Sequence, residues 1–130
     1  MTVPNNHREW VSKAANDFAT IALLRSGRGP ADAICFHAQQ GAEKMLKAFL
    51  VSHGVRPQKW HDLGRLVDEC ERYDGSLSVL KADADFLTSG VLARYPGSGI
   101  DPDETTTKQM VAAAERIRNE INKRLPPSTP

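Results

Sequence analysis

The polar residues of this sequence that are best placed to do chemistry recur at helical spacing between residues 36 and 50. They are Gln40, Glu43, Lys44 and Lys47. At about 100° of rotation per residue, these side chains fall within one narrow arc of a helix, roughly opposite Ala38, Met45 and Phe49. Phe36 lies on the same arc, so an aromatic ring stands beside two lysines and a glutamine. Such a set can hold a base or a phosphate, or it can form a subunit contact.

A simpler interpretation of this arc is a solvent-facing side of an amphipathic helix. Every such helix needs a polar face, and Glu43 with Lys47 makes a favourable ion pair four residues apart. Spacing alone favours this interpretation, because it requires no ligand. The arc is therefore a candidate site rather than an assigned one.

A second candidate is the run Arg94-Tyr95-Pro96-Gly97-Ser98-Gly99. An arginine followed by a rigid proline and flexible glycines can present its guanidinium and backbone N–H groups to an anion. A loop that ends a helix explains the same run, since an arginine is favourable at the negative end of the helix dipole. No Lys-Ser or Lys-Thr follows the glycines, so the run lacks the spacing of a phosphate-binding loop. Composition alone favours the loop that ends a helix.

The third candidate, His61-Asp62, is more simply explained as a helix cap than as a catalytic pair. The histidines lie at positions 7, 37, 53 and 61, and neither they nor the cysteines show metal-ligand spacing. We therefore predict no metal site, no cofactor and no catalytic residue.

The bulk properties indicate one globular domain. The chain has 130 residues, of which 40% are hydrophobic and 25% charged, with a formal net charge of +1. This charge supplies no general basic field, so we expect neither DNA nor membrane binding. Cys35 and Cys70 fall on apolar stripes and are predicted to be free core thiols in a reducing compartment. Because residues 1–10 also contain no apolar signal region, we expect a cytoplasmic protein.

Apolar periodicity predicts helices over about 6–25, 30–52, 62–73, 78–91 and 102–124. Start signals are Asn6 with Glu9, and Asp101 with Pro102. Stop signals include Gly54 and the turn residues 26–30, 74–76 and 95–99. No strand pattern is present, so the sequence predicts an all-α, antiparallel up-and-down bundle of four to five helices. We expect one domain over 1–130, with a short disordered tail at 126–130.

Three segments in this order resemble the HEPN family (higher eukaryotes and prokaryotes nucleotide-binding domain). They are FHAQQGAEKMLKAFL at residues 36–50, His61-Asp62-Leu63, and Arg94-Tyr95-Pro96-Gly97. The resemblance extends from about Trp10 to Leu125. It implies an antiparallel helical bundle that is commonly dimeric, in agreement with the periodicity.

The resemblance implies two broad roles. Many HEPN domains are metal-independent ribonucleases that use an arginine followed by a histidine a few residues later. Arg94 matches that arginine, but the chain continues Tyr-Pro-Gly-Ser-Gly-Ile-Asp and no histidine follows anywhere. The general acid–base group is therefore missing. The other role is that of small stand-alone HEPN proteins encoded beside minimal nucleotidyltransferases in toxin–antitoxin-like pairs.

The second role gives the predicted function, which is a non-catalytic module that binds a nucleotide or a nucleotidyltransferase partner. Carried over by position, its candidate binding residues are Gln40, Glu43, Lys44, Lys47, Arg94 and Tyr95. The alternatives are a ribonuclease toxin with an atypical site and a dimerisation scaffold in which Phe36 contacts a second subunit. The expected partners are thus a second copy of the chain, a nucleotidyltransferase, and a nucleotide or RNA.

Overall fold

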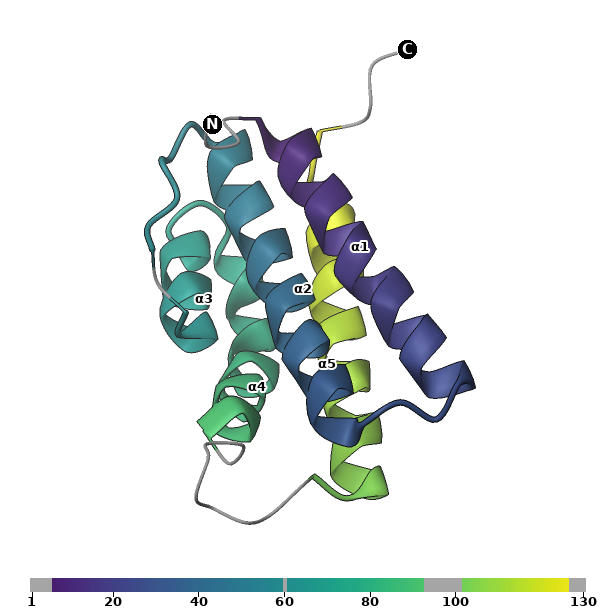
Figure 1. Cartoon of the computed structure of the whole chain (residues 1–130). Coiled ribbons are helices and arrows are strands. Elements are labelled where there is room, and N and C mark those ends of the chain that lie inside the picture. The colour runs from purple at the N-terminus through teal and green to yellow at the C-terminus, as the bar shows by residue number, and fades with distance from the viewer. Residues whose placement is uncertain (1–5, 60, 93–101, 127–130) are drawn as a thin grey trace.

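The computed structural model describes residues 6–59, 61–92 and 102–126, with no side-chain description for 90–92. In chain order its elements are α1 (His7–Ser26), α2 (Ala31–Ser52), α3 (Leu63–Glu71), the 3-10 helix η1 (Gly75–Leu80), α4 (Lys81–Leu92) and α5 (Glu104–Asn122). These ranges contain no strand. The predicted all-α helical bundle is confirmed (Figure 1).

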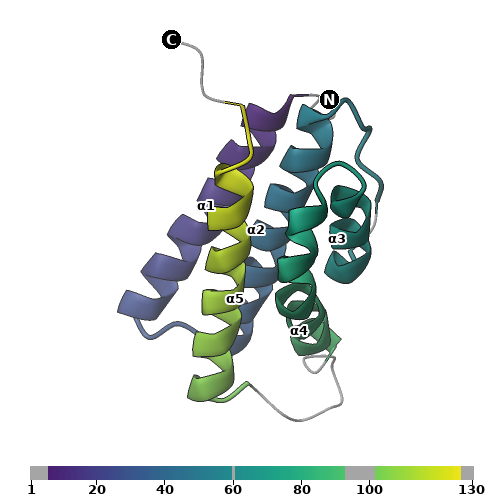
Figure 2. The ribbon, with the colours of Figure 1, turned by 180° about the vertical axis from the view of Figure 1, so that it is seen from behind.

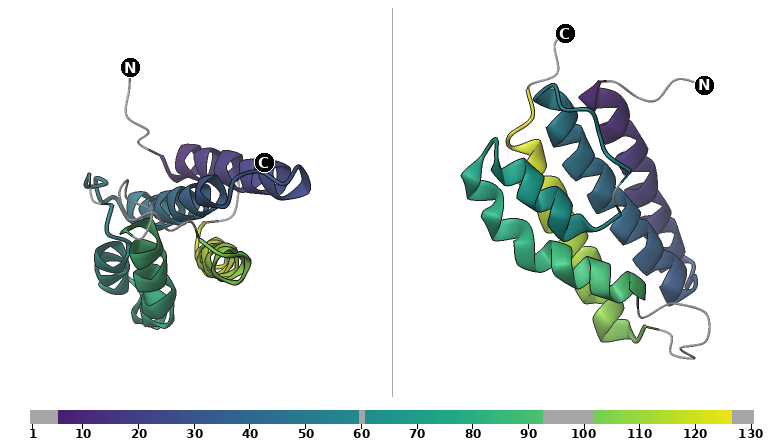
Figure 3. Two further views of the ribbon diagram at one scale, coloured as in Figure 1. Left: turned by 60° about the horizontal axis from the view of Figure 1, so that its bottom comes forward. Right: turned by 90° about the vertical axis from the view of Figure 1, so that its left-hand side faces the viewer.

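Helix α2 is the centre of the bundle. It packs against α1, α3, α4 and α5, and the end-on view places α1 on one side of it and the other three on the opposite side (Figure 3). Apolar residues close the core around it, among them Ala38, Met45, Leu46 and Phe49, which are almost completely buried. A helix surrounded in this way must bury part of its polar face as well.

Most of the local signals in the sequence act as predicted. Asn6 caps α1 by accepting a hydrogen bond from the backbone N–H of Glu9 at 3.0 Å. Gly54 adopts a positive φ of 77° just past α2, a conformation that other residues disfavour. Asp62 caps α3 by accepting from the N–H of Arg65 at 3.2 Å. These short-range interactions fix where each helix begins or ends.

Two predicted boundaries are wrong. Helix α5 is capped by Asp103 rather than by Asp101, because the Asp103 carboxylate accepts from the N–H of Thr106 at 2.6 Å. The helix predicted to begin at Ser78 begins at Lys81 instead. There the chain first forms η1, whose start is capped by Asp74, which accepts from the N–H of Ser76 at 3.0 Å.

Some predictions lie outside the described residues: the loop at 95–99 and positions 127–130 of the predicted tail. Both cysteines are buried and free, as predicted. Burial raises the pKa of the Cys70 thiol to about 12, so this group stays protonated in the core. Among the described helices, none combines the length and apolar character needed to cross a membrane.

Candidate polar site on helix α2

Neighbouring elements cover part of the polar arc of α2. Glu43 is only 4% exposed and Lys47 only 6%, so the solvent-facing interpretation is wrong for both. They form the expected pair, with Lys47 Nζ 3.0 Å from Glu43 Oε2. The ring of Trp10 in α1 lies against this pair, its centroid 5.7 Å from the same Nζ. Because α1 packs over this face of α2, two residues predicted to bind a ligand are used inside the fold.

Glu43 also holds a histidine from the start of α3. The second carboxylate oxygen of Glu43 lies 3.1 Å from Nδ1 of His61. Gln39 Nε2 donates to the backbone carbonyl of His61 at 3.3 Å and approaches the same oxygen of Glu43 at 3.4 Å. The side chain of His61 is nevertheless 76% exposed. A buried carboxylate thus orients an imidazole that faces solvent.

A matching cluster joins α1 to α2. Asp17 of α1 is buried, and its two carboxylate oxygens lie 2.6 Å from Lys44 Nζ and 2.8 Å from His37 Nδ1. Lys44 and His37 keep about a quarter of their side chains exposed. Each cluster therefore contains a buried carboxylate, a lysine and a histidine. Lys44 therefore pairs with a buried carboxylate and also remains partly accessible to solvent.

The exposed and partly exposed side chains of this region are grouped under the name α2 patch: Phe36, His37, Gln40, Lys44 and His61. Phe36 is 45% exposed, and its ring meets that of His37 edge-on with centroids 5.3 Å apart. Gln40 is half-buried and donates to Gln39 Oε1 at 2.8 Å. The patch presents an aromatic ring, an amide, a partly shared ammonium group and two imidazoles to solvent.

Of the predicted binding set, the structure brings Gln40, Glu43, Lys44 and Lys47 together on one face. Arg94 and Tyr95 lie outside the described residues, so their approach to this face stays a prediction. Sequence reasoning missed Asp17, His37 and Gln39 as members of the site. The signal for Asp17 was an acidic residue on the core-facing side of α1, in line with Ala14, Phe18 and Ile21.

The site has no arrangement suited to a metal ion among the residues described. In that part of the chain, no group of three or more His, Cys, Asp or Glu side chains is placed to hold one. Asp17 and Glu43 each face a lysine instead. The described side chains of the site are engaged in hydrogen bonds and ion pairs.

Comparison with known proteins identifies the family. A sequence model of the HEPN domain matches residues 7–124. The crystal structure of an archaeal HEPN homologue superposes with a TM-score of 0.73 at 21% identity, covering 92% of this chain and 97% of the other. At that identity the likeness shows the fold alone. A search of curated proteins found no significant match. The chain therefore belongs to the HEPN domain family of nucleotide-binding or ribonuclease-like modules.

Proposed function

We propose that this chain is a HEPN module that binds a nucleotide through its phosphate and base without cleaving RNA. It works in the cytoplasm beside a minimal nucleotidyltransferase, as one half of a toxin–antitoxin-like pair. The observation that carries the non-catalytic part is the missing histidine. All four histidines precede Arg94 in the chain, so the arginine-then-histidine pair of the ribonuclease members has no second member here.

The α2 patch supports the binding part of the proposal. Phe36 offers an exposed ring on which a base can stack, at about 1–3 kcal/mol per base in nucleic-acid complexes. Gln40 lies one helical turn from both Phe36 and Lys44, so its amide is placed between an aromatic and a cationic contact. Arg94 and Tyr95 complete the set by position in the sequence. Lys47 and Glu43 support the patch from below and do not face the ligand.

One observation favours the ribonuclease alternative. The imidazole of His61 is exposed and held by the buried Glu43, so an acid–base group is present even though none follows Arg94. This histidine comes from the start of α3 instead. A direct test of cleavage is therefore part of testing the proposal.

Calorimetric titration with ATP and other nucleotides tests binding. We expect Phe36→Ala and Arg94→Ala each to weaken binding about tenfold, the equivalent of about 1.4 kcal/mol. Tyr73→Ala is the matched control, because Tyr73 is a similarly exposed aromatic at 43% and lies outside the α2 patch. Lys47→Ala is unsuitable, since it would leave Glu43 buried without its lysine. No binding by the wild type, to any nucleotide or to a copurified nucleotidyltransferase, would end the proposal.

Incubation with total RNA in EDTA tests the absence of cleavage. The proposal expects intact RNA even at high protein concentration. Cleavage that His61→Ala abolishes and His53→Ala preserves would instead establish the ribonuclease alternative. Both histidines are exposed, but His61 also contacts the buried Glu43 and His53 packs on the buried Phe49. Circular dichroism of both variants therefore checks that each keeps the fold.

A further inference from the structure

The turn between α1 and α2 holds an arginine where the backbone favours glycine. The N–H of Gly27 donates to the Leu23 carbonyl at 3.0 Å, and the N–H of Gly29 donates to the Leu24 carbonyl at 2.5 Å. Between these two bonds Arg28 adopts a left-handed φ of 56°, and it is the one non-glycine residue with a positive φ among those described. Glycine usually occupies this position of a helix-ending turn, because a Cβ atom there crowds the backbone.

Packing does not explain this choice of residue. A Cβ atom at Gly29 would lie 2.6 Å from Leu24 Cδ2, so close packing on α1 requires the glycine at that position. Arg28 is exposed, and its backbone conformation would be easier for glycine. An arginine kept at a strained position indicates that its side chain has a use beyond the turn itself.

Arg28 lines a hollow of about 370 Å³, which we call the turn hollow. Its walls combine two cationic, two apolar and two polar side chains: Arg25, Arg28, Leu24, Ile34, Glu104 and Thr107. Seen from behind, the α1–α2 turn and the start of α5 lie at the same end of the bundle (Figure 2). The volume is at the small end of the range of about 300–1,000 Å³ that is typical of small-molecule sites.

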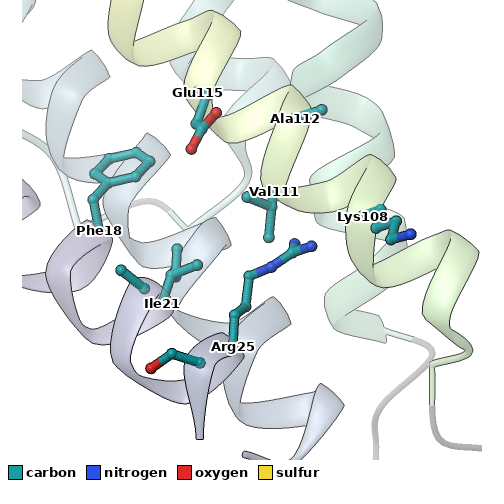
Figure 4. A pocket seen from close by; sticks show the side chains of 9 residues that line it. Phe18, Ile21, Arg25, Lys108, Val111, Ala112 and Glu115 are labelled. Carbon is teal, nitrogen blue, oxygen red and sulfur yellow. The ribbon is translucent and has the colours of Figure 1, made fainter. Parts of the chain in front are cut away.

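Both arginines of the turn hollow are unpaired. Within the described ranges, neither Arg25 nor Arg28 forms an ion pair or a side-chain hydrogen bond. Arg116 and Arg124, by contrast, each lie within 3.0 Å of an aspartate oxygen. Figure 4 shows Arg25 extending from α1 toward α5, the helix that also carries Lys108. Two guanidinium groups therefore line one small space with their donors unused.

Glu104 is the one acidic residue in the lining of the turn hollow. Its contact with Lys108 is long, at 3.9 Å, and both side chains are mostly exposed. Two arginines and one glutamate leave the lining with a surplus of one positive charge. The turn hollow therefore attracts an anion, and Glu104 weakens this attraction without cancelling it.

We infer that the turn hollow binds a phosphate group, held by the guanidinium groups of Arg25 and Arg28. A guanidinium can donate two parallel hydrogen bonds to an oxyanion. One such pair already uses both oxygens of a carboxylate, whereas a phosphate has enough oxygens to accept a pair from each arginine. The hydroxyl of Thr107 is not needed, because it donates to the Asp103 carbonyl at 2.8 Å. The apolar walls can contact the rest of a ligand that carries the phosphate.

This site is separate from the α2 patch. Ile34 in the turn hollow and Phe36 in the α2 patch are two residues apart on α2, so they project about 200° apart around the helix. The inference therefore goes beyond the proposed function and does not depend on it. The phosphate can be the free ion or part of a nucleotide, and the experiments below distinguish these two sources.

Calorimetric titration with inorganic phosphate at physiological ionic strength tests the site. Arg25→Gln and Arg28→Gly should each weaken binding about tenfold or more, because each removes one guanidinium group. Glu104→Gln should tighten binding, since it removes the acidic group of the lining. Arg56→Gln is the matched control, because Arg56 is exposed and follows the opposite end of α2. No phosphate binding by the wild type, or an equal loss in Arg56→Gln, would overturn the inference.

Urea unfolding of Arg28→Gly separates a binding role from a structural one. Glycine relieves the left-handed backbone, so this variant should be at least as stable as the wild type while it loses phosphate binding. Arg28→Lys keeps the charge but not the planar donor pair, and it should bind phosphate more weakly than the wild type. Unchanged phosphate binding in a folded Arg28→Gly protein would overturn the inference. A clear loss of stability would do so as well, because it would assign the arginine to the turn itself.

Titration with AMP identifies the source of the phosphate. Phe36→Ala weakens the α2 patch, so this variant isolates the turn hollow. AMP binding that is tighter than phosphate binding, and that Arg28→Gly then abolishes, would identify a nucleotide phosphate as the ligand. AMP binding no tighter than that of inorganic phosphate would identify the free ion. Because inorganic phosphate carries no base, the titrations with this ion can succeed even if the α2 patch binds no nucleotide.

Discussion

At the scale of single residues, two buried carboxylates decide which charges remain for a ligand. A buried charge is costly unless an opposite charge and hydrogen bonds compensate it. Glu43 and Asp17 obtain this compensation from Lys47 and Lys44, each helped by a histidine. The lysines of the polar arc are therefore first of all structural. The ammonium group of Lys47 is engaged by the buried Glu43. Lys44 pairs with Asp17, and only the exposed part of its side chain remains for a ligand.

This arrangement predicts an asymmetric stability cost. Lys47→Met leaves Glu43 buried without its cation and should lower the free energy of unfolding by about 3 kcal/mol. Glu43→Gln combined with Lys47→Met removes both charges, keeps the amide contacts with Gln39 and His61, and sets a thioether against Trp10. The double variant should therefore recover most of the loss. Urea unfolding measures the stability of both variants. Equal losses of stability in the single and double variants would show that an uncompensated buried charge does not cause the loss.

The sequence predicted which residues share the arc, because angular position depends only on residue spacing. It did not predict that Glu43 and Lys47 are buried, because the position of α1 over α2 depends on packing between residues far apart in the chain. Asp17 and Lys44 are 27 positions apart, so no local pattern joins them. The available signal was an acid among apolar residues in α1, which indicates a partner across the helix interface.

At the scale of elements, prediction succeeded wherever the determining interaction is local. Apolar periodicity gave all five helices, and Asn6, Gly54 and Asp62 gave three of their boundaries. Prediction failed where the same short segment is compatible with two local structures. Asp101 and Asp103 both resemble caps, and the choice depends on which carboxylate reaches a free N–H group. The 3-10 helix η1 was missed because its apolar residues fit an α-helical pattern as well.

The crossing of α1 and α2 makes a specific prediction at Gly41. A Cβ atom there would lie 2.8 Å from Phe18 Cε2, and the ring is restrained by Arg118. Alanine normally favours a helix by about 1 kcal/mol over glycine, but overpacking costs about 1–3 kcal/mol. Gly41→Ala should therefore lower stability by about 1 kcal/mol, and adding Phe18→Leu should relieve the clash.

Gly75→Ala is the control for that experiment, because nothing lies within 4 Å of a Cβ atom at this position. Thermal or urea unfolding of the three variants measures the effect. A more stable Gly41→Ala protein would show that the two helices can move apart without cost.

At the scale of the whole molecule, one arginine joins segments about fifty residues apart. Arg124 follows α5, and its guanidinium donates to Asp74 Oδ2 at 3.0 Å and to Ser76 Oγ at 2.9 Å. It also donates to the Glu120 carboxylate at 2.9 Å. These bonds hold the end of α5 against the start of η1.

This contact makes stability depend on acid pH. Hydrogen bonds from Ser76, and then the charge of Arg124, hold the pKa of Asp74 below its usual range. Lys123 and Arg124 likewise lower the pKa of Glu120. A carboxyl group whose pKa is lower in the folded state stabilises the protein above its unfolded pKa, and this contribution disappears as the pH falls through the folded value. Stability should therefore decline as the pH falls below about 5, where unperturbed aspartate and glutamate side chains begin to take up protons.

Asp74→Asn tests this origin, because an amide keeps the shape of the side chain and cannot titrate. We expect its urea midpoint to start lower at neutral pH and to fall less steeply between about pH 5 and pH 2. Glu104→Gln is the control, since the contact of Glu104 with Lys108 is long and exposed, and its profile should follow the wild type. If Asp74→Asn instead runs parallel to the wild type across the whole range, the acid sensitivity must come from other carboxylates. The contact of Arg124 with Asp74 would then be an exposed ion pair of little consequence for the fold.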